Sequence, residues 1–265
     1  MKPHLDELAN VFRTTIKGTT AASINVSHDG SIGHWIQSKY GVSPDSDPGA
    51  DWKGYELKTG RTKTTFGDWS PSSWIFPVRG KNALHPGTIA DRDEFLKVFG
   101  TPLPDSNPKV ISNPAKYRGR LSWSGEVVPK IREINRYGQK LEIDDGGSIT
   151  ATYYHDYDKR PDKASIVPHQ LHSGRIKIAQ WNEEKMRKHI DEKFGRNGWV
   201  KFHVKNGIFS EMWIGGPMTY NGWLELVRNG DVFFDSGMYQ GNPRPYCQWR
   251  ASNTLWRNSA SAIID

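Results

Sequence analysis

The sequence predicts an α/β or α+β fold in which helices flank a mixed sheet. The first reason is that segments with a helical spacing of apolar residues are interleaved with segments typical of strands. The second is the aromatic content, which at 12% of 265 residues supplies enough apolar surface for a packed core and argues against disorder. Because aliphatic residues are few, we expect Trp, Tyr and Phe to form much of that core.

Helices are predicted where apolar residues recur every three or four positions. These segments are residues 3–17, 30–40, 91–100, 182–194 and 219–228. The third segment begins with Asp91 and has Glu94 three positions later, an arrangement that resembles a capping box. The fourth carries Met186, Ile190 and Phe194 on one stripe, so we expect that face to lie against the core.

Strands are predicted where polar and apolar residues alternate, or where β-branched and aromatic residues gather. These segments are residues 52–58, 149–157, 199–204, 208–214 and 231–235. Asn206 and Gly207 separate the third strand from the fourth and are typical of a type I′ turn, which predicts a hairpin. The segment 44–49 is rich in Pro and Gly and predicts a turn just before the first strand.

The composition excludes several classes of protein. The mean hydropathy is −0.70, and no apolar stretch approaches the roughly 20 residues that a membrane span needs. The single cysteine, Cys247, rules out an internal disulfide and a cysteine-based zinc site. The first residues contain no apolar stretch, so we expect no secretory signal and a location in the cytoplasm.

Most of the positive charge lies in one segment. The chain has 36 Lys and Arg against 29 Asp and Glu, and residues 101–140 account for +5 of the formal net charge of +7. Such a patch attracts polyanions through counterion release, which favours nucleic acid as a partner, with Lys116, Arg118 and Arg120 as candidate contacts. The alternative is an ordinary solvated surface.

The clearest chemistry lies around the first predicted strand. Alternate side chains of a strand project to the same side, so Glu56 and Lys58 should share one face while Tyr55 and Leu57 face the core. Asp51 lies at the start of the strand and can turn toward Glu56. Two carboxylates suit Mg²⁺, and a metal-bound water beside an ammonium group can attack a phosphodiester. The alternative is an edge strand with a Glu–Lys face open to solvent.

Three segments resemble one family of nucleases. Asp51…Glu56-Leu57-Lys58 resembles the catalytic signature of PD-(D/E)xK nucleases, and with Thr59 is most similar to MvaI/BcnI-type restriction endonucleases and the related nicking enzyme MutH. Residues 31–37 resemble the glycine-containing helix start of that branch, and residues 229–257 are similar to its base-reading hairpin. The three matches follow the family's order and together span most of the chain.

The resemblance implies one two-lobed nuclease domain over residues 1–265 with a restriction-endonuclease-like core. The catalytic lobe is expected over residues 1–100 and parts of 140–205. The recognition lobe is expected over residues 205–265 together with the basic loops 101–140. The two lobes would flank a DNA cleft.

The resemblance also implies an activity. The chain would be a monomeric, Mg²⁺-dependent type II restriction endonuclease that cuts double-stranded DNA at a short site and leaves 5′-phosphate and 3′-hydroxyl ends. A cognate DNA methyltransferase would belong to the same restriction–modification system. Asp51 and Glu56 would hold the metal, and Lys58 would position the attacking water. Gln37 stands where the family often has a further acid; its amide can ligate a metal or orient water but adds no charge.

Further DNA contacts are expected after the catalytic strand and near the C-terminus. These candidates are Arg61, Lys63, Arg244, Tyr246, Arg250, Ser252 and Arg257. Arginine is the usual bidentate reader of guanine, so Arg250 and Arg257 are candidate base readers, with phosphate contact or plain exposure as the alternatives. The family has histidines near the positions of Arg250 and Ser252, so the site read can differ from the family's CC…GG sites.

Two other functions remain open at this point. A strand-specific nicking or repair nuclease of the same fold would relax supercoiled plasmid to open circles without linearising it. A non-catalytic DNA-binding module would use the segment 107–140 together with aromatic residues, show salt-sensitive binding that Mg²⁺ does not affect, and hydrolyse nothing.

Overall fold

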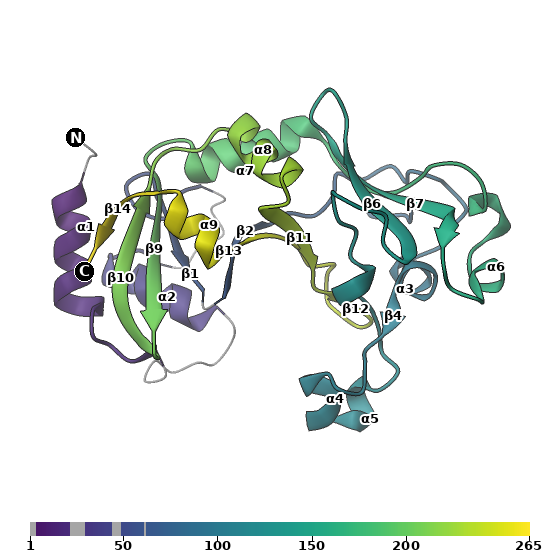
Figure 1. The fold of residues 1–265 in the computed structure, drawn as a ribbon, viewed down its shortest axis with the longest axis horizontal. Coiled ribbons are helices and arrows are strands. Elements are labelled where there is room, and N and C mark those ends of the chain that lie inside the picture. The colour runs from purple at the N-terminus through teal and green to yellow at the C-terminus, as the bar shows by residue number, and fades with distance from the viewer. Residues whose placement is uncertain (1–3, 22–29, 44–48, 61) are drawn as a thin grey trace. The chain divides into compact units, whose positions relative to one another are not determined.

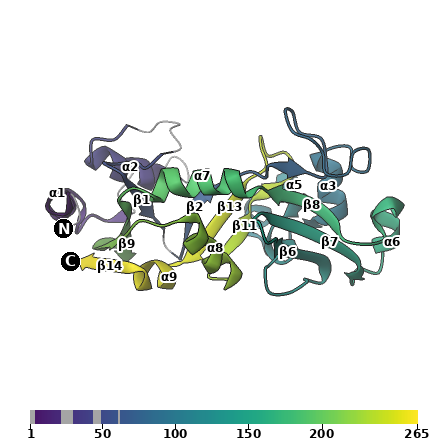
Figure 2. The same ribbon diagram turned by 90° about the horizontal axis from the view of Figure 1, so that it is seen from above.

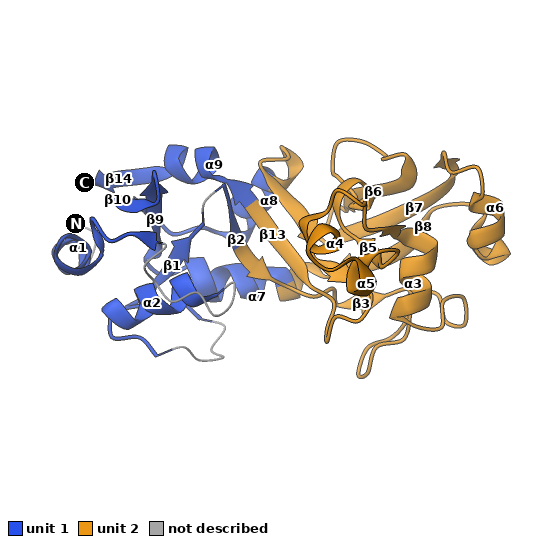
Figure 3. Ribbon diagram, turned by 90° about the horizontal axis from the view of Figure 1, so that it is seen from below, with its two compact units in different colours: residues 1–65, 186–226, 251–265 blue, residues 66–185, 227–250 orange. Residues whose placement is uncertain are grey.

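The computed structural model describes residues 4–21, 30–43, 49–60 and 62–265. It forms two compact units (Figure 3). Unit 1 comprises Met1–Thr65, Met186–Leu226 and Ala251–Asp265, and unit 2 comprises Phe66–Lys185 and Val227–Arg250. Each unit is therefore assembled from segments that are far apart in the sequence. Among the described residues, no helix has the length and apolar character of a membrane span.

Unit 1 is built on a four-stranded mixed sheet with the order β1-β9-β10-β14 (Figure 1). Its strands are β1 Tyr55–Thr59, β9 Gly198–Lys205, β10 Ile208–Gly215 and β14 Ala260–Ile264. β1 runs parallel to β9, and the other two pairings are antiparallel. Asn206 and Gly207 have φ of 53° and 82°, as a type I′ turn requires, and join β9 to β10 in the predicted hairpin.

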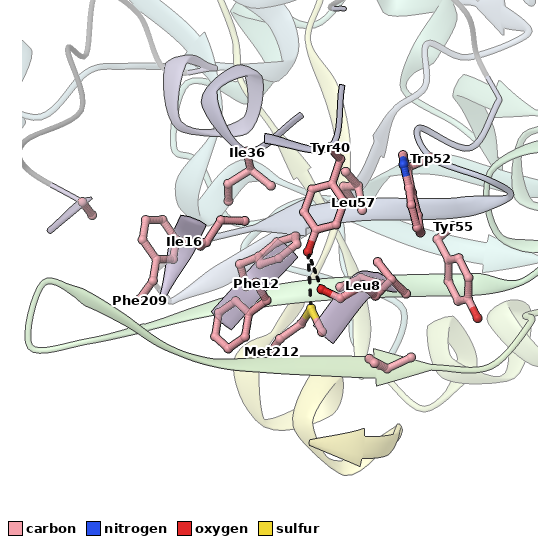
Figure 4. Close-up of a cluster of buried hydrophobic side chains, with 14 residues drawn as sticks. Leu8, Phe12, Ile16, Ile36, Tyr40, Trp52, Tyr55, Leu57, Phe209 and Met212 are labelled. Carbon is pink, nitrogen blue, oxygen red and sulfur yellow. Dashed lines mark hydrogen bonds between the residues drawn. The ribbon is translucent and has the colours of Figure 1, made fainter. Parts of the chain in front are cut away.

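Helices lie on both faces of this sheet, and Figure 2 shows α2 and α9 on opposite sides of β1 and β9. The helices with residues in unit 1 are α1 Leu5–Val11, the π-helical turn Phe12–Ile16, α2 Ser31–Lys39, α7 Glu183–Phe194, α8 Tyr220–Arg228 and α9 Asn253–Asn258. Leu57 and Val200 face α1 and α2 and join a buried cluster with Phe12 and Ile36 (Figure 4). On the opposite face, Trp199 packs edge-on against Trp256 with the ring centroids 4.8 Å apart.

This core orients the candidate catalytic residues. Leu57 is buried against α1 and α2, and side chains alternate along a strand, so Glu56 and Lys58 project to the other face of β1. β1 is an edge strand, with β9 as its neighbour on one side. The sequence-predicted alternation of this strand is therefore confirmed.

Unit 2 contains, wholly or in large part, a second four-stranded sheet with the order β3-β8-β7-β6 and two three-stranded sheets with the orders β12-β5-β4 and β11-β13-β2. The strands are β2 Lys63–Asp68, β3 Ser73–Trp74, β4 Thr101–Pro102, β5 Leu121–Trp123, β6 Tyr137–Ile143, β7 Ile149–Asp158, β8 Ile176–Trp181, β11 Val232–Ser236, β12 Met238–Tyr239 and β13 Cys247–Ser252. The helices are α3 Arg92–Phe99, α4 Pro108–Ser112, α5 Pro114–Tyr117 and α6 Lys163–Ile166. Asp91 caps α3 as predicted, accepting a hydrogen bond from Glu94 N at 2.8 Å.

The core of unit 2 is largely aromatic. Trp123 lies edge-on to Phe95 with the ring centroids 5.1 Å apart, and Trp181 lies edge-on to Phe234 at 4.9 Å and to Trp249 at 5.4 Å. Edge-to-face packing at these separations is favourable beyond the area it buries. The expectation that aromatic residues supply much of the core is confirmed.

The boundaries of the units differ from those predicted for the lobes. Residues 66–100 lie in unit 2, whereas residues 205–226 and 251–265 lie in unit 1. The cause is backbone pairing: β10 is the hairpin partner of β9, and β14 pairs with β10, so both segments join the sheet of β1. Which unit cleaves DNA and which recognises it stays a proposal.

Candidate active site

A tight turn places Asp51 beside β1. Trp52 and Tyr55 exchange backbone hydrogen bonds of 2.9 and 2.7 Å, and the two residues between them, Lys53 and Gly54, have φ of 45° and 82°. The chain therefore reverses within two residues and returns Asp51 to the free edge of the strand. There its Oδ2 accepts a hydrogen bond from Leu57 N at 2.8 Å.

Gln37 of α2 holds Asp51 from the other side. Its Nε2 donates to Asp51 Oδ1 at 2.6 Å, although 14 residues separate the two positions in the sequence. The carbonyl oxygen of the Gln37 side chain is buried and has no hydrogen-bond partner among the described residues. The amide thus positions the carboxylate with one atom and leaves its acceptor atom unused.

Two lysines meet at Glu56, whose side chain is 3% exposed. Lys58 Nζ lies 2.7 Å from Glu56 Oε1, and Lys193 Nζ of α7 lies 3.0 Å from the same oxygen. The other oxygen, Oε2, is buried and has no hydrogen-bond partner in the part of the chain that the structure describes. Both ammonium groups therefore hold one side of the carboxylate and leave the second oxygen available for a ligand.

These groups line one pocket of about 420 Å³ at the edge of β1. Its walls include Asp51, Glu56, Lys58, Lys193 and Gln37. The structure therefore brings together all four predicted catalytic residues, and it adds Lys193, which sequence reasoning missed. Arg61 cannot be placed, because it lies outside the described residues.

Burial dominates the electrostatics of the pocket. It raises the pKa of Asp51, and the nearby charge of Glu56 raises it further. Burial also lowers the pKa of Lys58; Glu56 opposes this effect, whereas the positive charge of Lys193 adds to it. The site therefore favours less charge than these side chains would carry in water.

The oxygen donors of the pocket suit a hard divalent cation. Asp51 contributes a carboxylate, and Glu56 and Gln37 contribute two buried oxygens that lack hydrogen-bond partners among the described residues. Carboxylate and amide oxygens are the ligands that Mg²⁺ prefers. In the described part of the chain, no group of three His, Cys, Asp or Glu side chains has metal-binding geometry, so a third protein oxygen would have to come from another residue type, and Gln37 is the candidate.

Three of the predicted DNA contacts, Lys116, Arg118 and Arg120, lie together in unit 2. They line a shallow pocket of about 330 Å³ with Gln240 and Gly241. The guanidinium of Arg120 also packs over the ring of Tyr239 at 4.6 Å. The structure thus joins the basic segment to the predicted base-reading segment, because β12 pairs with β5.

Two arginines near β13 are engaged with acids. Arg244 Nη2 lies 2.7 Å from Asp68, and its guanidinium covers the ring of Tyr246 at 4.5 Å. Arg250 Nη1 lies 3.1 Å from Asp235. For Arg250 to read a base, its ion pair with Asp235 would have to open, or the guanidinium would have to contact the acid and the base at the same time.

The remaining three predicted contacts, Lys63, Ser252 and Arg257, are in unit 1. Lys63 is the exposed first residue of β2. Ser252 caps α9, accepting a hydrogen bond from Leu255 N at 3.3 Å, a structural role that the sequence analysis did not foresee. Arg257 lines a different pocket of unit 1, together with His203 and Lys205.

Comparisons with known proteins agree with this architecture. The model of the LlaMI restriction endonuclease family matches residues 12–263. The type II restriction enzyme ScrFI of Lactococcus lactis subsp. cremoris is 37% identical over 275 residues, which cover 97% of each chain. Restriction endonuclease MvaI, solved with its cognate DNA substrate, aligns over 99% of this chain and 98% of its own with a TM-score of 0.58 at 13% identity. The MvaI comparison shows a shared fold.

Proposed function

The chain belongs to the LlaMI restriction endonuclease family, and on this basis we propose that it is a Mg²⁺-dependent endonuclease that cuts duplex DNA at a short site. The predicted resemblance to MvaI-type enzymes, the restriction-endonuclease-like fold and the prediction of an enzyme are confirmed. The metal requirement, the products and the roles of individual residues are the subject of the proposal. It rests on the convergence of Asp51, Glu56 and Lys58 in one pocket that retains unused buried oxygens.

Asp51, Glu56 and Gln37 would hold the metal ion. Two carboxylates and two ammonium groups line the pocket, so its formal charge is zero without a metal. A pocket with a third acid in place of Gln37 would attract a cation more strongly, so we expect this chain to need more Mg²⁺ or the phosphate of DNA to complete the site. When bound, the ion would lower the pKa of a coordinated water and polarise the phosphate.

Lys58 and Lys193 share one task in this proposal, and Lys58 has a second. Both hold Glu56 Oε1 and so fix the carboxylate with Oε2 available. Lys58 Nζ, whose pKa is lowered chiefly by burial, would hold the attacking water by a hydrogen bond. In the proposed step the water oxygen would form a bond to phosphorus and release a proton to solvent, the bond from phosphorus to the 3′-oxygen would break, and the 3′-oxygen would take up a proton from solvent. The products are a 5′-phosphate and a 3′-hydroxyl end.

Incubation of supercoiled plasmid with the purified protein and Mg²⁺ tests this function. We expect discrete linear fragments with 5′-phosphate ends, and no cleavage when a chelator is present. Asp51→Ala should leave the plasmid intact but still bind duplex DNA. Full activity of Asp51→Ala would refute the assignment, and open circles that persist to the end of the reaction would favour the nicking nuclease instead.

The assembly state, cellular location and partner follow from the same proposal. We propose that the protein acts as a cytoplasmic monomer on double-stranded DNA, and that a DNA methyltransferase protects the host's own sites. Sedimentation with and without duplex DNA measures the assembly state. The proposed methyltransferase partner is tested with DNA that the parent protein cleaves. Resistance of this DNA after modification by the cognate methyltransferase would support the proposal.

A further inference from the structure

A second pocket of about 450 Å³ lies in unit 1, between the end of the β9–β10 hairpin and α9. His203 and Lys205 of β9 form one wall, Glu211 and Trp213 of β10 form the next, and Arg257 of α9 lies opposite with three polar residues of the same helix. None of these residues lines the catalytic pocket. The second pocket is therefore a separate concave site in the same compact unit.

An aromatic stack forms the base of this pocket. The ring of His203 lies on that of Trp213 with the centroids 4.5 Å apart and an interplanar angle of 19°. Trp213 Nε1 donates to Glu211 Oε2 at 2.7 Å, which occupies part of the acid's hydrogen-bonding capacity. His203 Nδ1 is buried and has no hydrogen-bond partner among the residues that the structure describes. The stack thus fixes the ring of His203 in the pocket wall and leaves the hydrogen-bonding capacity of this nitrogen unused by the described residues.

The charges of the pocket favour an anion. Lys205 and Arg257 are exposed cations on different elements, and Glu211 is the single acid among the lining residues. Burial is the largest influence on the ring of His203 and lowers its pKa, so the imidazole is mainly neutral at neutral pH. Two cations against one acid leave the pocket with a net positive charge.

The pocket lies on the same face of the sheet as the catalytic lysine. Lys58 of β1 is in register with Lys201 of β9, and His203 follows two residues later on the same face. The Cα atoms of Lys58 and His203 are therefore roughly 8 Å apart, given the usual rise along a strand and spacing between strands. Each DNA strand carries a phosphate about every 3.4 Å along the helix axis. A duplex whose scissile phosphate lies at Lys58 would thus bring phosphates a few nucleotides away to the side of the sheet on which this pocket lies.

We propose that this pocket binds a backbone phosphate of the DNA close to the cleaved bond, with Arg257 and Lys205 as the charged contacts and His203 as a ring-nitrogen contact. The inference rests on the proposed function, which supplies DNA as the ligand. Several converging donors match the oxygens of a phosphodiester, whereas a guanine edge offers two acceptors to one guanidinium. Arg257 therefore positions the substrate and does not read its sequence.

Binding measured without metal, so that no cleavage occurs, tests this assignment. The probes are a duplex that contains the mapped cleavage site and a duplex of scrambled sequence, each titrated over a range of salt concentrations. We expect Arg257→Ala to weaken binding to both duplexes by the same factor of roughly tenfold. We also expect the slope of log K against log salt to fall by about 1, as for the loss of one phosphate contact.

A control variant and a second variant of the pocket make the result specific. Arg13→Ala removes an exposed arginine of the π-helical turn on the other side of the sheet and should leave both affinities unchanged. His203→Gln should weaken both duplexes equally but leave the salt slope intact, because it removes no charge. Thermal melting of each variant checks that the fold persists.

Two outcomes would overturn the inference. An Arg257→Ala protein that loses discrimination at one base pair with an unchanged salt slope would make Arg257 a base reader. Parental affinity for both duplexes would show that the pocket does not contact DNA. The parent protein is assayed on plasmid with Mg²⁺ in parallel, so a failure of the pocket with an active parent is distinguished from a failure of the proposed function. If the parent does not cleave, its binding to the scrambled duplex still decides whether the pocket holds a phosphate.

Discussion

The two pockets of unit 1 are both lined by cations and at least one acid, but the cations are largely buried in one pocket and exposed in the other. In the catalytic pocket, two lysines are 12% and 19% exposed and share one oxygen of Glu56. In the second pocket, Lys205 and Arg257 are exposed and face an open concavity. A charge buried beside an acid alters geometry and reactivity, whereas a charge in solvent contributes mainly to affinity. Variants of the two pockets should therefore affect different measured quantities.

Lys58→Ala gives the largest expected effect. We expect the rate of cleavage to fall by about a thousandfold or more, because the variant loses both the proposed hydrogen bond to the attacking water and one of two contacts to Glu56. Affinity for duplex DNA should change by less than about threefold. A gel-based cleavage assay under single-turnover conditions measures the rate. A fall in affinity that accounted for the whole loss would remove the distinction between the pockets.

Lys193→Met should lower kcat by roughly a hundredfold with little change in KM, because Glu56 loses a charged partner in a buried site. Lys193→Arg keeps the charge and should recover part of the rate. Lys188→Ala, on the same helix but 71% exposed, is the matched control and should behave as the parent. Equal losses in the Lys188 and Lys193 variants would show that α7 as a whole, and not the contact with Glu56, is responsible.

Lys201 lies on β9 between the two pockets and is predicted to destabilise the fold. It is fully buried, its Nζ donates to Gly60 O at 3.1 Å, and burial lowers its pKa from 10.5 to about 8. A pKa shift of this size corresponds to a cost of about 3 kcal/mol for burying the charged form of Lys201, and the hydrogen bond offsets about 1 kcal/mol of this cost. Lys201→Met should therefore raise the free energy of unfolding by about 2 kcal/mol at pH 7.

The pH dependence of this effect follows from the sign of the shift. Between pH 8 and 10.5 the unfolded chain binds the Lys201 proton while the folded chain has released it, so the stability of the parent rises with pH. The advantage of Lys201→Met should be complete below pH 8, decrease as the pH rises above 8, and be absent by pH 10.5. Urea unfolding at several pH values measures it. An advantage that persists unchanged at pH 10.5 would show that the buried charge is not its cause.

The smallest expected effect concerns the basic surface of unit 2. Lys116→Ala should weaken DNA binding by about threefold and reduce the salt slope by about 1, since Lys116 borders an open pocket and its charge is screened. Arg136→Ala, also exposed and in the same basic segment but outside that pocket, is the control. An effect of Arg136→Ala equal to that of Lys116→Ala would mean that total charge matters and position does not.

The sequence predicted the parts of the site whose determinants are local. Asp51, Glu56 and Lys58 lie within eight residues, and strand alternation places Glu56 and Lys58 on one face as predicted. The turn that returns Asp51 to the strand lies at Lys53 and Gly54, which were predicted to be part of the strand, so β1 begins at Tyr55 and not at residue 52. Lys193 could not be identified in this way. It reaches Glu56 across 137 residues of sequence, and its surroundings on α7 are as charged and amphipathic as those of Lys188.

The same limit explains the outcome for the fold. The five predicted helices appear as α1 with its π-helical turn, α2, α3, α7 and α8, and the five predicted strands as β1, β7, β9, β10 and β11. The short elements between residues 101 and 123 were not predicted, because two- and three-residue strands have no periodicity to detect. Arg257 was grouped with Arg250 by proximity in the sequence, yet the packing of Trp256 on Trp199 fixes α9 in unit 1.

Metal binding at the catalytic pocket tests the central claim most directly. Crystals of the protein with duplex DNA and Mn²⁺ in place of Mg²⁺, measured at a wavelength where manganese scatters anomalously, locate the ion. We predict a peak within coordination distance, about 2.2 Å, of a carboxylate oxygen of Asp51 and of Glu56 Oε2. A well-ordered complex with no peak at these oxygens, or with the ion bound elsewhere while cleavage proceeds, would contradict the account.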